Sequence, residues 1–185
     1  VGSLADGAFA ASSAVWMLSN WFENLEDTNR LGLRLRDYVS SVNLAIATKA
    51  RSKQIETACT LSCLLLWDEQ YCVVHVGDSR IYLWEGGILC QLTRDQVRAG
   101  RLTSVVGHRT ETDIFYMEGI RHGGQRFLLC SDGLYKRMNL ALLAAAMQHL
   151  SRRNLQKTLR QLTDYVIDQG EQDNVSVAIL MNDER

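Results

Sequence analysis

The sequence predicts an α+β fold in which antiparallel sheets lie under helical layers. Three observations lead to this class. Two long helical segments come first, a run of closely spaced apolar strands follows, and two further helices precede a last strand. At 185 residues the chain is long enough for one domain with a buried core, so we expect residues 1–185 to form a single domain.

The helices are read from apolar residues that recur at helical spacing. Residues 9–25 place Ala14, Met17, Leu18 and Trp21 on one face, which predicts a first helix. A second helix is expected from about residue 28 to residue 50. The other two are expected at residues 140–149 and 155–168.

The strands are read from short apolar runs between turn residues. The first four runs cover residues 58–67, 71–76, 80–84 and 88–92, and three residues or fewer separate them. Connections this short join antiparallel neighbours, so these runs predict a meander. Further strands are expected at residues 113–118, 125–130 and 175–181.

Composition excludes several classes of partner. Hydrophobic residues make up 46% of the chain and charged residues 22%, which is ordinary for a globular protein. A net charge of −1 gives no reason to expect a nucleic acid or an anionic membrane as a partner. No apolar run approaches the roughly 20 residues that span a bilayer.

The cysteines indicate a reducing compartment. All lie inside apolar, strand-like runs, and none forms a pair with zinc-ligand or redox spacing. We interpret them as reduced side chains packed in a core, and we therefore expect a cytoplasmic protein. They are Cys59, Cys63, Cys72, Cys90 and Cys130.

The chain contains no proline, although average usage of about 5% predicts roughly nine. Proline concentrates in loops, so its absence suggests that mobile loops have been closed up in this sequence. The abrupt junctions lie at Gly2-Ser3, at Ala8-Phe9 and between Asp95 and Arg101. We expect the last two to border mobile loops.

Carboxylates stand at the ends of several predicted strands. Asp78 follows residues 71–76, Asp132 follows residues 125–130, and Asp173 precedes residues 175–181; Asp6-Gly7 repeats the pattern. Carboxylates beside Gly or Asn at strand ends can hold a hard cation, so the four strings together predict a metal site at the rim of a sheet.

Each acidic string also has a simpler interpretation. Gly77-Asp78-Ser79 is good hairpin chemistry, Asp132 could cap a helix, and Asp173-Asn174 could be a turn. His75 on an apolar strand is more typical of a core histidine than of a ligand. Arg80 fits either a phosphate contact or an ion pair.

The order of these strings resembles the metal-dependent protein serine/threonine phosphatases, the PPM or type 2C family, of the bacterial kind. The matching stretches run in family order over nearly the whole chain: residues 4–7, 73–84, 91–93, 102–107, 127–135 and 170–180. The resemblance implies a four-layer α-β-β-α sandwich, in which two antiparallel sheets are flanked by helices.

The resemblance also implies residue roles. Asp6 resembles the aspartate that bridges two catalytic metals, and the carbonyl of Gly7 a ligand of one of them. Asp132 and Asp173 resemble the carboxylates of the other metal, while Asp78 with Asp132 would hold a weaker third ion. Ser131, Asn174 and Thr60 would orient these ligands through hydrogen bonds.

Oxygen ligands alone suit Mn²⁺ or Mg²⁺ rather than zinc. Two such ions can activate a shared water for direct attack on phosphorus, so no phosphoenzyme is needed. The implied function is hydrolysis of phosphoserine and phosphothreonine in proteins, opposing a bacterial Ser/Thr kinase. A monomer is expected, with phosphorylated proteins and a cognate kinase as partners.

The sequence departs from the family pattern at its start. The opening strand with an Arg and an acidic pair is not visible, Ala8-Phe9-Ala10-Ala11 replaces the usual glycines, and the flap between Thr93 and Leu102 is short. If these parts are truly missing, the chain would be a catalytically silent PPM-fold binding module. A hydrolase acting on another phosphate ester is a third interpretation.

Overall fold

The computed structural model describes residues 6–182, which form two compact units. Each unit is assembled from two separate stretches of chain. Within the described residues, unit 1 comprises residues 6–78 and 95–120, and unit 2 comprises residues 79–94 and 121–182. The β3–β4 hairpin is thus inserted into the sequence of unit 1 but belongs to unit 2.

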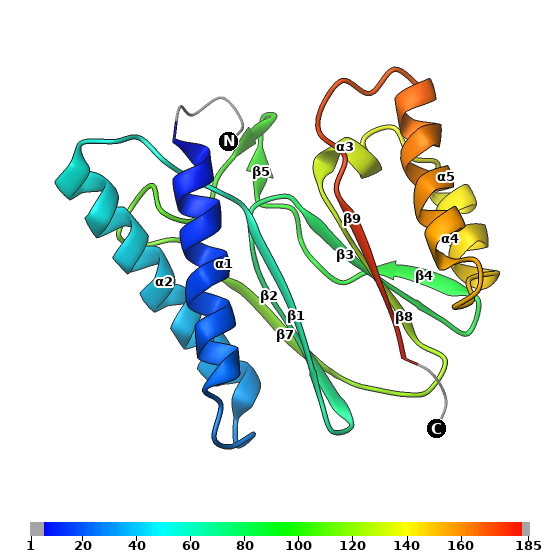
Figure 1. Ribbon diagram of the computed structural model, residues 1–185, viewed down its shortest axis with the longest axis horizontal. Helices are drawn as coiled ribbons and strands as arrows, with labels where there is room; N and C mark the ends of the chain where they lie inside the picture. Colours follow the sequence, from blue (N-terminus) through cyan, green and yellow to red (C-terminus); the bar gives the residue numbers. More distant parts are fainter. Residues whose placement is uncertain (1–5, 183–185) are drawn as a thin grey trace. The chain divides into compact units, whose positions relative to one another are not determined.

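Unit 1 is a helical hairpin on an antiparallel sheet. Helices α1 (Gly7–Glu23) and α2 (Leu31–Lys53) run side by side (Figure 1). The sheet has the strand order β1-β2-β7, with β1 at Leu61–Trp67, β2 at Gln70–Val76 and β7 at Phe115–Ile120. The central strand β2 is almost wholly buried, because it has a partner on both edges and helices above it.

The two helices bury their faces in different ways. Helix α1 buries small residues, Ala10 and Ala14, which let it approach α2 closely. Helix α2 buries a branched stripe that includes Val39 and Ile46, at the spacing of one helical face. The ring of Trp21 in α1 also stacks on that of Tyr38 in α2, with centroids 5.6 Å apart.

Unit 2 is a four-stranded antiparallel sheet, in the order β4-β3-β8-β9, covered by helices (Figure 1). Its core brings Leu128 of the sheet together with Leu143, Met147 and Val166 of the helices, all fully buried. Its elements are β3 (Arg80–Glu85), β4 (Ile88–Gln91), β8 (Arg126–Cys130), α3 (Asp132–Tyr135), α4 (Leu140–Gln148), α5 (Leu155–Asp168) and β9 (Val177–Met181).

The α+β prediction, with antiparallel sheets and helices, is confirmed, but the meander is wrong at one point. β1 pairs with β2, and β3 with β4, whereas β2 and β3 belong to different sheets. β2 already has β7 on its second edge and β3 has β8 on its own, so neither offers an edge to the other. Residues 77–79 therefore carry the chain from one sheet to the next.

The two junctions expected to border mobile loops lie in a helix and in a small hairpin. Ala8 and Phe9 lie in the first turn of α1, where the Phe9 amide donates to the Asp6 carbonyl. The stretch from Asp95 to Arg101 contains β5 (Val97–Arg98) and the start of β6 (Arg101–Leu102), which pair as a small hairpin. Gly2-Ser3 lies outside the described residues.

The helices between residues 6 and 182 do not have the properties of membrane spans. None of them combines the length and the apolar character that a crossing requires.

Candidate active site

Asp132 and Asp173 are brought to the same edge of the unit 2 sheet. Asp132 comes directly after β8, and Asp173 lies shortly before β9. Because β8 and β9 are antiparallel, with Cys130 opposite Val177, the end of one strand lies beside the start of the other. The predicted pairing of these two carboxylates at one sheet rim follows from this register.

Ser131 ties the two acidic segments together. Its amide donates to the Ser176 carbonyl at 3.0 Å, and its Oγ accepts from the Ser176 amide at 3.0 Å. The same hydroxyl donates to the Asn174 carbonyl at 3.2 Å. A single side chain therefore fixes the residue before Asp132 against the residue after Asp173.

Gly133 is required by the same close approach. A Cβ atom at this position would lie 2.6 Å from the Asn174 carbonyl oxygen, closer than real Cβ contacts allow. Only glycine lets the first turn of α3 pack on the loop that carries Asp173. The Ser131-Asp132-Gly133 string thus holds a packing requirement as well as a carboxylate.

The Asp132 carboxylate is a half-buried acceptor with two nearby donors. Oδ1 accepts from the Gly133 amide at 3.0 Å, and Oδ2 lies 2.5 Å from the Lys136 ammonium, one helical turn later. The Asp132 side chain keeps 28% of its surface exposed, and Lys136 keeps 52%.

Asp173 sits in a tight turn held by another acid. Its Oδ1 accepts from the Asn174 amide at 2.8 Å, while its own amide donates to Glu171 Oε1 at 3.0 Å. The Asp173 amide, followed by the Gln172 amide and the charge of Arg137, holds the pKa of Glu171 below its ordinary value. Glu171 therefore stays ionised and supports the turn.

In unit 1 the predicted ligand Asp6 stands at the start of α1. Its carbonyl accepts from the Thr57 hydroxyl at 2.6 Å and from the Phe9 amide at 3.0 Å. Thr57 also accepts from the Ala10 amide at 3.2 Å, so it straps the first helical turn to the Asp6 backbone. The Asp6 side chain makes no capping hydrogen bond to the helix, so capping leaves its carboxylate oxygens available.

Asp78, a further predicted ligand in unit 1, follows a strongly anchored glycine. Gly77 has a φ of +112°, and a Cβ there would lie 2.5 Å from Thr60 Cγ2. Its amide donates to Gln96 Oε1 at 2.7 Å, and its carbonyl accepts from the Gln96 amide at 2.8 Å. Gln96 thus holds the residue before Asp78 from both sides.

His75 supports the same backbone from the core. It is fully buried, with Nδ1 2.8 Å from the Ser62 hydroxyl and Nε2 2.9 Å from the Gly77 carbonyl. A carbonyl only accepts, so Nε2 carries a proton and donates to Gly77, while Nδ1 shares a hydrogen bond with the Ser62 hydroxyl. The interpretation of His75 as a satisfied core histidine is confirmed.

Arg80 is held by two aromatic side chains of unit 2. Its guanidinium lies 3.5 Å from the centroid of the Tyr135 ring, and it donates to the Tyr82 hydroxyl at 3.0 Å. The contact with Tyr135 is a cation–π interaction.

Sequence reasoning missed the supporting residues Gln96, Thr57 and Lys136. Gln96 and Thr57 reach their partners across 19 and 51 positions, so no local pattern marks them. Lys136 could have been found, because a cation four residues after an acid is a helical ion-pair spacing.

The donor set agrees with a hard cation. Within residues 6–182 no three side chains of His, Cys, Asp and Glu gather into a ready-made ligand cluster. What the chain offers is carboxylate and carbonyl oxygen at strand and helix ends, which fits Mn²⁺ or Mg²⁺. The five cysteines are free, and burial raises the pKa of Cys59, Cys63 and Cys72, so these thiols are poor nucleophiles.

The fold and the sequence together identify the family. The chain belongs to the protein phosphatase 2C family, whose model matches residues 1–166. It is similar to the serine/threonine protein phosphatase PstP of Mycobacterium tuberculosis, with 27% identity over 202 residues. That alignment covers 97% of this chain and 38% of PstP, so the chain spans less than two-fifths of the curated relatives' length.

Solved structures share the fold. The PstP catalytic domain in complex with two manganese ions superimposes with a TM-score of 0.81 at 26% identity, covering 95% of this chain and 81% of that one. PppA, a regulatory component of the T6SS in Pseudomonas aeruginosa, gives a TM-score of 0.70 at 26% identity and covers 80% of this chain and 67% of its own.

Proposed function

We propose that the chain is a metal-dependent serine/threonine protein phosphatase of the bacterial type, with residues 1–185 as one catalytic domain. The observation that carries this proposal is the placement of Asp132 and Asp173 at one rim of the unit 2 sheet, in a chain of the protein phosphatase 2C family. A purely structural rim would not need two carboxylates with exposed oxygen atoms.

The proposed ligands are oxygen atoms of five residues. The Asp6 carboxylate and the Gly7 carbonyl would help to hold one catalytic ion, and Asp132 and Asp173 would help to hold the other. Asp78 would bind a weaker third ion. The manganese-bound PstP catalytic domain supports Mn²⁺, and Mg²⁺ has the same preference for oxygen.

The bound ions would lower the pKa of a shared water and neutralise the charge of the phosphate. The protein's own part is to hold the carboxylates. Ser131 fixes the two acidic segments of unit 2 to each other, and Gln96 fixes the backbone before Asp78. Lys136 pairs with Oδ2 of Asp132 and would have to give up this oxygen to a bound metal ion.

The proposed substrates are phosphoserine and phosphothreonine in proteins, and the proposed role is to oppose a Ser/Thr kinase. We place the protein in the cytoplasm as a monomer with no nucleic acid or membrane partner. The near-neutral charge and the free cysteines support this setting.

The test is a metal titration of the metal-free protein with a phosphothreonine peptide. We expect release of phosphate to require Mn²⁺ or Mg²⁺ and to stop on addition of EDTA. A phosphotyrosine peptide serves as the specificity control. N-ethylmaleimide should leave the activity in place, since no thiol attacks phosphorus. Activity that survives EDTA, or that the alkylating reagent alone removes, would contradict the proposal.

A further inference from the structure

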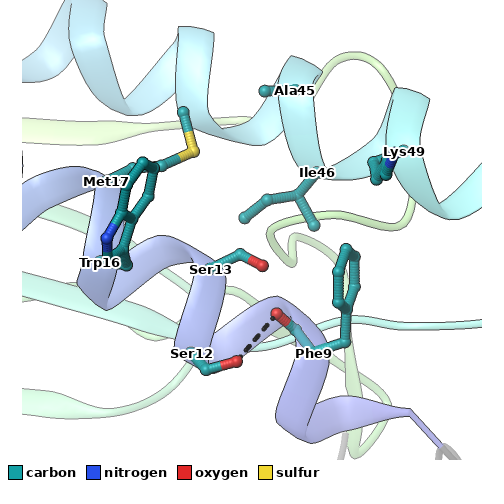
Figure 2. A pocket seen from close by; sticks show the side chains of 8 residues that line it. All are labelled: Phe9, Ser12, Ser13, Trp16, Met17, Ala45, Ile46 and Lys49. Carbon is teal, nitrogen blue, oxygen red and sulfur yellow. Dashed lines mark hydrogen bonds between the residues drawn. The ribbon is translucent and has the colours of Figure 1, made fainter.

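An open groove of about 510 Å³ runs between α1 and α2 on unit 1 (Figure 2). It exists because small residues, Ser12 and Ser13 of α1 and Ala45 of α2, face each other between larger neighbours. Phe9 bounds one end, and Trp16 with Met17 bounds the other. Phe9 and Trp16 are seven residues apart on α1, which corresponds to about 10 Å along the helix.

The groove is mainly apolar but contains two polar groups with no protein partner. Among the described residues the Ser13 hydroxyl makes no hydrogen bond and the Lys49 ammonium makes no ion pair, although both line the groove. Their neighbours differ. Ser12 donates to the Ala8 carbonyl at 2.7 Å, and the Lys53 ammonium lies 5.1 Å from the centroid of the Phe9 ring.

The charge distribution explains why Lys49 has no counter-ion. Residues 7–22 of α1 carry no charged side chain, so the helix beside Lys49 offers no carboxylate. The first acid of α1 is Glu23, at the opposite end of the helix. Lys49 therefore stands beside an apolar trough, together with a hydroxyl that has no protein partner among the described residues.

We infer that this groove binds a medium-chain aliphatic carboxylate, with its head group at Lys49 and Ser13 and its tail along Phe9, Ile46 and Trp16. The volume lies within the range of about 300–1,000 Å³ found for small-molecule sites, which are also apolar with a few placed polar groups. One cation and one hydroxyl match a carboxylate better than a phosphate, which recruits several donors. Trp16, 70% exposed without a ligand, would be covered by the tail.

Binding can be measured by calorimetry with dodecanoate below its micelle concentration. We expect saturable binding with one site per chain, and a change in tryptophan fluorescence that Trp16→Phe removes. Acetate, which has the head group alone, should not bind. Dodecyltrimethylammonium, which has the same tail and the opposite charge, should bind at least several-fold more weakly.

Two variants separate the head group from the tail. Lys49→Glu should weaken dodecanoate binding at least tenfold, because a carboxylate would then face a carboxylate. Lys53→Glu is the matched control one turn away, outside the groove lining, and should have a clearly smaller effect. Ser13→Phe fills the groove and should abolish binding, with thermal unfolding used to confirm that the variant folds.

Three outcomes would overturn the inference. The first is the absence of saturable binding by dodecanoate. The second is equal binding of the two amphiphiles, which would indicate only an adhesive apolar surface for a protein or a second copy. The third is an unchanged affinity in Lys49→Glu. None of these readouts depends on phosphatase activity, so the inference and the proposed function can fail separately.

Discussion

The Lys136 ammonium lies 2.5 Å from Oδ2 of Asp132, an ion pair between a predicted metal ligand and a cation one helical turn away. If Asp132 binds a metal ion as proposed, the lysine would compete with that ion for the same oxygen and would also repel its charge. The pair is partly exposed, and exposed ion pairs contribute about 0.2–1 kcal/mol, so its influence on metal binding is modest but measurable.

Lys136→Met is therefore expected to tighten Mn²⁺ binding roughly two- to fivefold, as the free energy of such a pair implies. Electron paramagnetic resonance of free Mn²⁺ measures this without any turnover. Lys136→Arg keeps the charge and should bind Mn²⁺ much like the wild type. Lys157→Met is the control for general charge loss, since Lys157 is exposed on α5 and lies outside the Asp132 and Asp173 segments. Equal affinity in Lys136→Met and wild type would show that the pair does not oppose the metal.

The aspartates should differ in their effect on the rate. Asp132→Asn and Asp173→Asn each remove a charged ligand from a proposed catalytic ion, so kcat should fall by roughly two orders of magnitude or more. Asp78→Asn should lower kcat much less, because Asp78 would serve only the weaker third ion. Steady-state kinetics with p-nitrophenyl phosphate compare the three, with thermal unfolding as the check on folding. If Asp78→Asn lowered kcat as severely as Asp132→Asn in folded protein, the distinction between ligands of the catalytic ions and a ligand of the third ion would be wrong.

Gly133 offers a test that leaves every ligand in place. Gly133→Ala puts a Cβ 2.6 Å from the Asn174 carbonyl oxygen, so the Asp173 loop must move away from α3. We expect at least a tenfold weaker Mn²⁺ affinity together with reduced activity. Gly170→Ala is the matched control, since its Cβ meets no atom within 4 Å and its φ of +84° costs only backbone strain. Gly170→Ala should lower the melting temperature without weakening Mn²⁺ binding. An equal loss of Mn²⁺ affinity in both variants would refute the packing argument.

Stability should decline on the alkaline side. Burial raises the pKa of Cys59 to about 11 and those of Cys63 and Cys72 to about 12, from 9.0. The folded state keeps the neutral thiols, whereas the unfolded state loses their protons near pH 9. The stabilisation is thus complete below pH 9 and is lost as pH rises through 11 to 12. Urea denaturation at pH 8 and pH 10 measures the loss in the free energy of unfolding. The double variant with Cys63→Ala and Cys72→Ala should show a smaller loss. An equal loss in the variant and the wild type would argue against buried thiols as its cause.

Local patterns predicted the elements well and their connections less well. Helix α5 occupies Leu155–Asp168, the predicted bounds, because its apolar residues recur at one clear period. The connection from β2 to β3 was predicted as a hairpin because Gly77-Asp78-Ser79 has the residues of a tight turn. The strands that occupy the free edges of β2 and β3 are β7 and β8, which lie far away in the sequence.

The candidate site shows the same division. Asp132 and Asp173 could be placed together from strand ends alone, since each adjoins a short apolar run. The residues that hold the site could not, because Gln96 reaches Gly77 through a bond whose partners are far apart in sequence. The α1–α2 groove left no local sign either. It depends on where Ser13 and Ala45 meet, which only the packed hairpin decides.

The interleaved order of the two units has a consequence for synthesis on the ribosome. Every strand of the β1-β2-β7 sheet has emerged once residue 120 has left the exit tunnel, so unit 1 can fold while the rest is still being translated. The β3–β4 hairpin emerges earlier than β7 but must wait for β8 and β9, with Ile81 and Leu83 uncovered in the meantime. We expect stalled nascent chains that expose residues 1–125 to protect unit 1 from protease while leaving residues 79–94 open to cleavage. The nascent hairpin is thus the part of the chain most in need of a chaperone.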